Sequence, residues 1–279
     1  MSNISAAAVM ALRNRTNAPM MDCKSALQEA AGDMEKAADI LRKRNKAIQD
    51  KKGERETAEG RVAAFISPDQ KIGALVEVRC ESAPVANTEA FIKFTGDIAR
   101  QAALKAPADV AELEKQPFVD SPQHSIKDRI GEAIGLLREN MRVARFARLT
   151  GLVGAYCHHD GRSGAMIAVE GPKADPTLLK ELCMHIVHHN PLATRREDIP
   201  AATVERERDI ARTQAAATGK PANIVDKIAE GKLKTWFGEN VLLEQPFLKD
   251  PSQGSVGEVL KKAGLTLIRF VRFKVGELS

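Results

Sequence analysis

Aromatic side chains are scarce in this chain of 279 residues, which has 4% aromatics with a single Trp and a single Tyr. Proteins that bind single-stranded nucleic acid commonly stack its bases on aromatic rings. The sequence supplies few such rings, although its net charge is +5. We therefore expect nucleic acid not to be its main partner.

Cysteine is also sparse, with four residues in the whole chain. Cys23, Cys80, Cys157 and Cys183 are far apart and form no Cys-x-x-Cys pair. This spacing indicates neither a disulfide scaffold nor a zinc knuckle. We expect all four to be small buried hydrophobic residues.

Long apolar runs are missing as well. No run approaches the roughly 18 residues that a membrane-spanning helix needs, and the first residues do not have a charged-then-apolar signal layout. The expectation is a cytoplasmic protein that does not enter a membrane. A hydrophobic content of 43% is enough for a sizeable core divided over two or three compact units.

Motifs for nucleotide binding and for nucleophilic catalysis are absent. The chain has no Gly-x-x-x-x-Gly-Lys-Ser/Thr, no Gly-x-Gly-x-x-Gly and no Gly-x-Ser-x-Gly. We expect a protein that binds no nucleotide directly, needs no cofactor and is not an enzyme.

The N-terminal stretch carries helix punctuation. Asn17 and Pro19 favour a new helix beginning near Pro19, Gly32 suits a left-handed C-terminal cap, and Asp33 can cap the next helix. This predicts a three-helix module over residues 1–50. Met20 and Met21 stand at the corner between two helices, where they would either form an adaptable partner contact or close the small core.

From Gly60 the apolar period changes from helix to strand. Residues 61–66 and 72–80 read as a hairpin, and a helix capped by Asn87 or Thr88 follows. The pattern recurs 91 positions later without a gap, so that Gly60 matches Gly151 and further pairs follow in one register. A second helix over residues 176–189 completes the repeat. We predict an α+β fold with two related hairpin-plus-helix subdomains.

The remaining segments connect or extend these units. Residues 107–122 read as a polar connector and residues 126–140 as a helix. Two helices over residues 201–217 and 222–236 would form an antiparallel hairpin, and a last strand would cover residues 267–275. The predicted units are the module 1–50, core subdomain N over 51–140, core subdomain C over 141–200 and 241–279, and a coiled-coil-like insertion over 201–240.

Two charged clusters leave alternatives open. The basic run Arg42, Lys43, Arg44, Lys46, Lys51 and Lys52 reads as a solvated helix end and linker, or as a contact for RNA or the ribosome. His185 with His188 or His189 has a spacing compatible with metal ligation, and His158-His159 occupies a hairpin turn. The simpler interpretation is that these histidines bind no metal.

A family resemblance follows from several of these segments. Met20-Met21-Asp22-Cys23-Lys24 resembles the N-terminal signature of the elongation factor Ts family. Further segments match that family in order along nearly the whole chain: Ala26-Leu27, Gly32-Asp33, Leu41-Arg42, Ala58-Glu59-Gly60, Leu75-Val76-Glu77-Val78, Gly219-Lys220-Pro221 and Gln245-Pro246-Phe247.

The resemblance implies a function in protein biosynthesis. Similar proteins are guanine nucleotide exchange factors for the GTPase elongation factor Tu, and their N-terminal module is UBA-like. By this resemblance Met20, Met21, Asp22 and Lys24 would contact the nucleotide-binding domain of elongation factor Tu. His158 and His159 would face a second domain of the same partner.

One segment departs from the family pattern. Relatives typically have Thr-Asp-Phe-Val where this chain has Ser82-Ala83-Pro84-Val85. Ala has no carboxylate to accept hydrogen bonds, and Pro is smaller than Phe and fixed in φ. The segment is still expected to contact the partner. The alternative functions are a relative that binds the GTPase or the ribosome without strong exchange activity, and an RNA-binding module.

Overall fold

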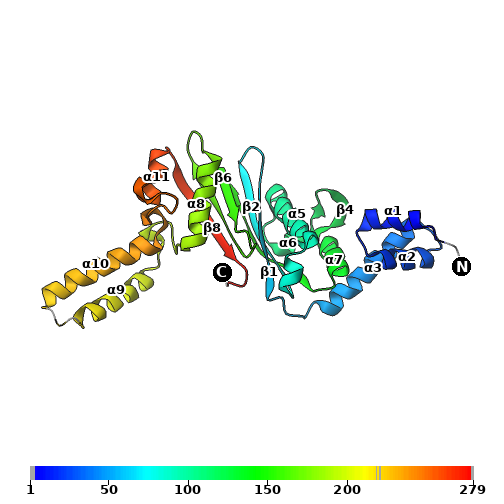
Figure 1. The fold of residues 1–279 in the computed structure, drawn as a ribbon, viewed down its shortest axis with the longest axis horizontal. Coiled ribbons are helices and arrows are strands. Elements are labelled where there is room, and N and C mark those ends of the chain that lie inside the picture. The colour runs from blue at the N-terminus through cyan, green and yellow to red at the C-terminus, as the bar shows by residue number, and fades with distance from the viewer. Residues whose placement is uncertain (1–3, 218, 220, 278–279) are drawn as a thin grey trace.

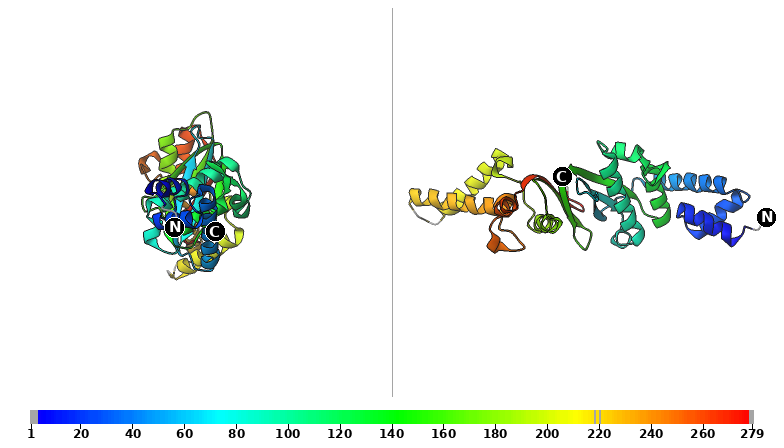
Figure 2. Two further views of the ribbon diagram at one scale, coloured as in Figure 1. Left: turned by 90° about the vertical axis from the view of Figure 1, so that its right-hand side faces the viewer. Right: turned by 90° about the horizontal axis from the view of Figure 1, so that it is seen from above.

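The computed structural model describes residues 4–217, 219 and 221–277. These form an elongated mixed α+β molecule (Figure 1). Three helices lie at one end, two back-to-back sheets occupy the middle, and a pair of long helices projects from the other end, as the view from above also shows (Figure 2). None of the described helices has the length and apolar content needed to cross a membrane.

The N-terminal module consists of α1 (Ala6–Thr16), α2 (Met20–Glu29) and α3 (Met34–Lys52). Its punctuation confirms the predicted signals: Asn17 has φ 53°, α2 begins directly after Pro19, and the Gly32 N–H donates to the Leu27 carbonyl at 2.8 Å. Asp33 caps α3 by accepting from the Lys36 N–H at 3.0 Å. The small core contains Val9, Leu12, Cys23, Ala26, Leu27, Ala37 and Leu41.

The basic run forms the solvent-exposed C-terminal end of helix α3, as predicted, but it is not a linker. The basic run lies within the helix, whose second half packs on α7 (Ile126–Leu137). Close approach is possible because α7 has Gly131 and Gly135 there: a Cβ on Gly135 would lie 2.1 Å from Asn45 Oδ1. One continuous helix therefore belongs both to the module and to its attachment on the core.

The first sheet contains β1 (Glu59–Ile66), β2 (Ile72–Cys80) and β5 (Met141–Thr150), in the order β1-β2-β5. Its outer face packs with α4 (Ala83–Ala86), α5 (Glu89–Lys105) and α7 in one apolar core. Strand β5 pairs with β2 although it lies after residue 140, where the sequence placed the end of the first subdomain.

The polar connector expected over residues 107–122 is instead largely structured. It contains α6 (Val110–Lys115), β3 (Pro117–Phe118) and the start of β4 (Ser121–Ser125), and β3 pairs with β4. Leu113 and Phe118 are buried in the first core, which explains why so polar a segment is ordered.

The second sheet has the same order, with β6 (Leu152–Cys157), β7 (Ser163–Glu170) and β8 (Thr266–Lys274). It packs with α8 (Pro176–His189) and α11 (Val256–Lys262), which confirms the predicted helix over 176–189. Short 3-10 turns cover Arg196–Asp198, Leu242–Glu244 and Pro251–Gln253.

In sequence, α9 (Ala201–Ala216) and α10 (Ala222–Asn240) lie between α8 and α11. They pack against each other as a hairpin that projects from one end of the molecule (Figure 1). Lys220, part of the motif read as the break between these helices, lies outside the described residues. Trp236 and Phe237 near the end of α10 contact each other and join a small core with Val241.

The two sheets share one register. The β1–β2 partners Arg61↔Val78 become the β6–β7 partners Leu152↔Val169 when 91 is added to each number. The pairing with the third strand shifts between Glu77 and Val78 in the first sheet, and at the equivalent step between Ala168 and Val169 in the second. The 91-residue repeat seen in the sequence thus extends to backbone pairing and to a bulge.

The two hairpins also hold each other. The Val62 N–H donates to the Gly161 carbonyl at 2.7 Å, and the Val153 N–H donates to the Gln70 carbonyl at 2.8 Å. These four residues form two pairs separated by 91 positions, so the contact is reciprocal. Apolar side chains fill the space between the sheets: Val62, Leu75, Leu149, Val153, Met166, Ala168, Phe273 and Val275.

Glu77 is a buried acid between the sheets, with 1% of its surface exposed. Its carboxylate accepts from Arg79 Nε at 2.8 Å, Arg145 Nε at 2.7 Å and the Gly276 N–H at 3.1 Å. The Arg145 guanidinium also lies 4.4 Å from the centre of the Phe273 ring. One carboxylate therefore ties β2 and β5 to the end of β8.

Glu77→Ala should lower the free energy of unfolding by about 3 kcal/mol, because it leaves two mostly buried arginines without their acid. Urea denaturation measures this change. Glu54→Ala, at an exposed position, is the matched control and should stay within about 0.5 kcal/mol of wild type. A Glu77→Ala protein as stable as that control would contradict the role given to the carboxylate.

Candidate functional site

The corner at the start of α2 presents two methionines to solvent. Met20 is 40% exposed and Met21 is 72% exposed, whereas Cys23 one turn later is fully buried in the module core. Neither methionine belongs to that core, so the alternative in which they close it is wrong. Lys24 is exposed on the same helix.

Asp22, also on this first turn, faces the body of the protein. Its carboxylate forms an ion pair with the guanidinium of Arg138. Arg138 follows α7 with φ 62°, a left-handed conformation that is uncommon outside glycine. Lys52 at the end of α3 donates its Nζ to the Arg138 carbonyl at 2.5 Å. The backbone at Arg138 is thus fixed beside α3, and its side chain reaches α2.

Glu139 and Asn140, which follow Arg138, form hydrogen bonds with other segments of the chain. Glu139 accepts from the Ser82 N–H at 3.0 Å and from Ser82 Oγ at 2.5 Å. Asn140 donates its N–H to Glu81 at 2.6 Å and its Nδ2 to the Arg55 carbonyl at 2.7 Å. We call residues 138–140 the junction turn, because they join α2, the end of α3 and the start of α4. No sequence motif marked this turn, which the periodicity placed inside a helix.

The short helix α4 carries the segment that departs from the family pattern. Ala83 and Pro84 are exposed, while Val85 is half-buried against the first core. Pro84 sits in the first turn, where its missing N–H removes no helical hydrogen bond. Cys80, just before it, is buried, and burial raises the pKa of its thiol to about 11. The outward face of α4 is therefore small and uncharged.

Arg61 connects α4 to the turn between β6 and β7. Its Nη1 lies 3.4 Å from Asn87 Oδ1, just after α4. Its guanidinium also rests against Gly161, where a Cβ would come within 2.4 Å of it. No sequence pattern marks Arg61, since an arginine on a strand gives no signal by itself.

The two histidines of this turn differ in exposure. His158 is half-buried and its Nδ1 lies 3.0 Å from the Tyr156 hydroxyl, whereas His159 is exposed. Their ring centres are 4.2 Å apart. The structure thus links the three predicted contact segments in a row: the α2 corner, the α4 turn and the β6–β7 turn.

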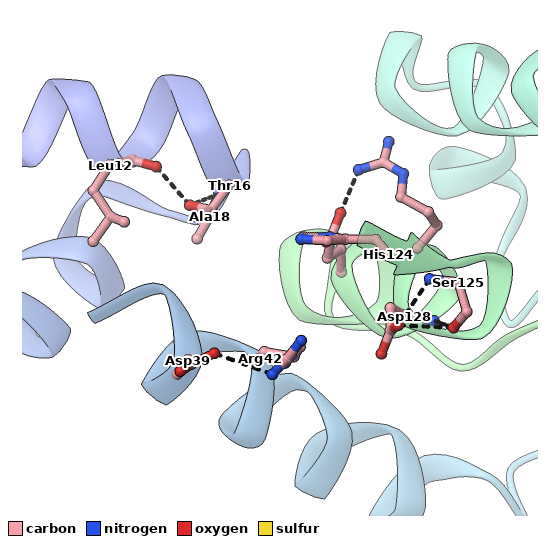
Figure 3. Close-up of polar contacts among 10 residues, drawn as sticks. Leu12, Thr16, Ala18, Asp39, Arg42, His124, Ser125 and Asp128 are labelled. Atoms are coloured by element: carbon pink, nitrogen blue, oxygen red, sulfur yellow. Dashed lines mark hydrogen bonds and ion pairs between the residues drawn. The ribbon is translucent and has the colours of Figure 1, made fainter. Parts of the chain in front are cut away.

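A cleft separates the module from the core on another side, between α1–α3 and the β4–α7 region (Figure 3). Polar side chains on each side bond within their own side: Thr16 Oγ1 to the Leu12 carbonyl at 2.7 Å, Arg42 to Asp39 at 3.1 Å, and His124 to Glu132 at 2.8 Å. Ser125 and Asp128 form a capping box that starts α7. Among the residues that the structure describes, no hydrogen bond or ion pair crosses this cleft.

His185 is a structural residue. It is fully buried, its Nε2 lies 2.9 Å from Gln245 Oε1, and its Nδ1 accepts from the Leu248 N–H at 3.1 Å. Burial lowers the pKa of His185 to about 4, against the partial compensation of the Gln245 contact. With both nitrogens engaged it has no lone pair for a metal, while His188 and His189 are exposed. Within the described ranges no cluster of three or more metal-ligating side chains occurs.

These features define an elongated α+β protein in which side-chain contacts link three exposed segments: the α2 corner, the α4 turn and the β6–β7 turn. The profile of the family described as "Elongation factor TS" matches residues 84–277. The chain is 40% identical to elongation factor Ts of Methylococcus capsulatus over 99% of its length and 93% of the relative's. It is 42% identical to that of Ralstonia nicotianae, over 99% and 92%, and 40% identical to that of Aquifex aeolicus, over 97% of both chains. The chain belongs to the elongation factor Ts family.

Stability should fall in acid because of His185. In the unfolded chain this histidine has its usual pKa of about 6.5, so the unfolded state binds the proton first as the pH falls from 6.5 towards 4. We expect its contribution to lower the free energy of unfolding by about 2 kcal/mol between pH 7 and pH 5.

Urea denaturation at the two pH values measures this effect. His185→Gln should be less stable at pH 7 but should lose that part of the pH dependence, whereas the exposed control His188→Gln should retain it. Equal pH dependence in His185→Gln and wild type would contradict the assignment.

Proposed function

We propose that this chain docks on elongation factor Tu through three segments: Met20, Met21 and Lys24, with Asp22 holding this corner to the core through Arg138; Ser82, Ala83, Pro84 and Val85; and His158 and His159. As a member of its family it is a guanine nucleotide exchange factor for elongation factor Tu in translation elongation, not an enzyme. The observation that carries this function is the match to elongation factor Ts sequences along 99% of the chain.

Exchange follows from linkage between two binding equilibria. A factor that binds the nucleotide-free GTPase more tightly than the GDP-bound form must weaken the affinity for GDP by the same factor. No covalent bond changes. The physical means is to disturb the phosphate loop and the magnesium ligands of the GTPase, which hold the nucleotide.

The three segments offer different chemistry to that partner. The two methionines are flexible and polarizable, which suits a contact that must adapt as the GTPase changes shape. Lys24 adds a positive charge beside them, and Asp22 belongs to this segment through its ion pair with Arg138. His159 offers an exposed ring at the far end of the row.

A second candidate function is binding without strong exchange. It is favoured by one observation: α4 exposes Ala83 and Pro84. By the resemblance described above, the family typically has Asp and Phe at these positions. The α4 surface of this chain supplies neither a carboxylate nor a large apolar wedge next to a magnesium site. Release of fluorescent GDP from elongation factor Tu of the same source distinguishes the two, since binding alone would leave the release rate unchanged.

We infer further that the chain divides as its repeat suggests: a UBA-like module over 1–50, two related core subdomains, and the α9–α10 hairpin inserted into the second. The common register and the equivalent bulge support a repeated unit. The pairing of β5 with β2 argues for moving the subdomain boundary from residue 140 to about residue 150.

The double substitution Met20→Ala/Met21→Ala should slow factor-stimulated GDP release about tenfold at subsaturating factor, because exposed apolar anchors carry much of the energy of a protein interface. Stopped-flow fluorescence measures the rate. Met10→Ala removes a methionine that is 42% exposed elsewhere on the same module and should leave the rate unchanged. Equal rates for the double variant and wild type would argue against this contact.

Introducing the Asp and Phe that are typical of the family at positions 83 and 84 tests whether these two side chains increase exchange. If exchange now proceeds without an acid and a large apolar side chain on α4, Ala83→Asp/Pro84→Phe should raise the maximal rate of GDP release about fivefold. The reason is that a carboxylate accepts charge-assisted hydrogen bonds from the partner. The matched control Ala83→Asn/Pro84→Phe has the same size but no charge and should gain less. A graft with no effect would show that α4 contributes little to exchange in this chain.

A further inference from the structure

The α2 corner and the α4 turn are held by adjacent residues of one turn. The Arg138 side chain binds Asp22 on α2, and the Glu139 side chain binds Ser82 at the start of α4. We propose that Arg138 and Asp22 are positioning residues for exchange: their ion pair sets the orientation of the N-terminal module, and Asp22 acts through Arg138 rather than on the partner. This inference rests on the proposed docking of the module on elongation factor Tu.

Helix α3 is the first attachment of the module. Ala37 and Leu41 lie in the module core, and Ile48 further along the same helix packs against the first core. A single helix seated on α7 through Asn45 and Gly135 fixes the module along one line. It leaves bending and rolling about that line to be restrained by something else.

The Arg138–Asp22 ion pair can supply this second restraint on the orientation of the module. Among the hydrogen bonds and ion pairs of residues 4–217, 219 and 221–277, Arg138–Asp22 is the one that joins α1 or α2 to the chain beyond α3. On the cleft side, the hydrogen bonds of Thr16, Arg42 and His124 stay within their own side, and Figure 3 shows those of Thr16 and Arg42. The Arg42 charge attracts the Asp128 carboxylate across the cleft without an ion pair. Among the polar contacts of the described residues, the module is therefore tied to the core by α3 and by this one side-chain pair, which lies on the helix that carries Met20 and Met21.

The junction turn itself is firmly fixed. The Arg138 N–H donates to the Ile134 carbonyl at 2.9 Å, the Arg138 carbonyl accepts from Lys52, and Asn140 is 5% exposed with three hydrogen bonds. These contacts use the backbone of Arg138 or its neighbours. Changing the Arg138 side chain therefore removes the link to Asp22 and leaves the turn in place.

The exposure of the two side chains sets how much the loss of the Arg138–Asp22 ion pair should matter. The Arg138 side chain is 50% exposed and that of Asp22 36%, so their attraction is screened by water and contributes little to global stability. A looser module would lower the fraction of molecules ready to bind, which raises the factor concentration needed for half-maximal exchange. The maximal rate, reached when all of the GTPase is bound, should stay the same.

A charge-swap cycle tests the proposal. GDP release from elongation factor Tu is titrated with wild type, Arg138→Asp, Asp22→Arg and the double reversal Asp22→Arg/Arg138→Asp. Each single reversal should raise the half-saturating concentration about fivefold with an unchanged maximal rate, and the double reversal should return it to within about twofold of wild type. Melting temperatures of all four proteins should agree within a few degrees.

A second readout needs no partner. Spin labels at Gln28→Cys on α2 and Lys127→Cys on α7, in a Cys157→Ser background, report the distance between module and core; Cys157 is the partly exposed one of the four cysteines. The distance distribution should broaden in each single reversal and narrow again in the double reversal.

The outcomes distinguish failure of the ion-pair inference from failure of the proposed exchange function. An Asp22→Arg protein that stays impaired whatever occupies position 138 would overturn the inference, because Asp22 would then contact the partner itself. Unchanged distance distributions in the single reversals would also overturn it. A wild type that does not accelerate GDP release would refute the proposed function alone, while the distances still decide whether the ion pair orients the module.

Discussion

The reciprocal hydrogen bonds between the two hairpins fix the geometry on which the rest of this protein depends. Each turn carbonyl, at Gln70 and Gly161, accepts from the first strand of the opposite hairpin. Because a buried backbone donor is costly to leave unpaired, the two sheets cannot slide past each other without losing both bonds. The β6–β7 turn is thereby held beside β1, next to Arg61 and α4. This central pairing therefore brings together α4 and the β6–β7 turn, two of the segments proposed to contact the partner.

Much of the fold could be predicted because its signals are local. Asn17, Pro19, Gly32 and Asp33 act within one turn of the backbone, and the 91-residue repeat lies in short apolar strands that match position by position. The junction turn gave no such signal, since Arg138 adopts a left-handed conformation that sequence patterns assign to glycine or asparagine. The continuation of α3 in place of a linker was missed because charged residues suggested solvent, while the glycines that receive the helix lie far away on α7.

The candidate site was predictable to a different degree in each part. The two methionines were identified from the sequence, but whether they lie in the core or at the surface depends on how three helices close, which spacing cannot decide. His185 belongs to a pattern that also suits metal ligands. Its hydrogen-bond partners, Gln245 and Leu248, are 60 or more residues away along the chain and settle its role. Arg61 and Glu139 matter through contacts across the fold, which leave no trace in local sequence.

The 19 residues of α3 form a rod roughly 28 Å long, at about 1.5 Å per residue. It is anchored near one end and carries the module at the other, so it behaves as a lever arm. The α7 seat at Asn45 lies about 17 Å from the far end at Met34, so a tilt of about 10° there would displace that end by about 3 Å for little loss of packing at the pivot. The positions of Met20 and Met21 therefore depend on how residues near the pivot pack, although these residues are remote from both methionines in sequence.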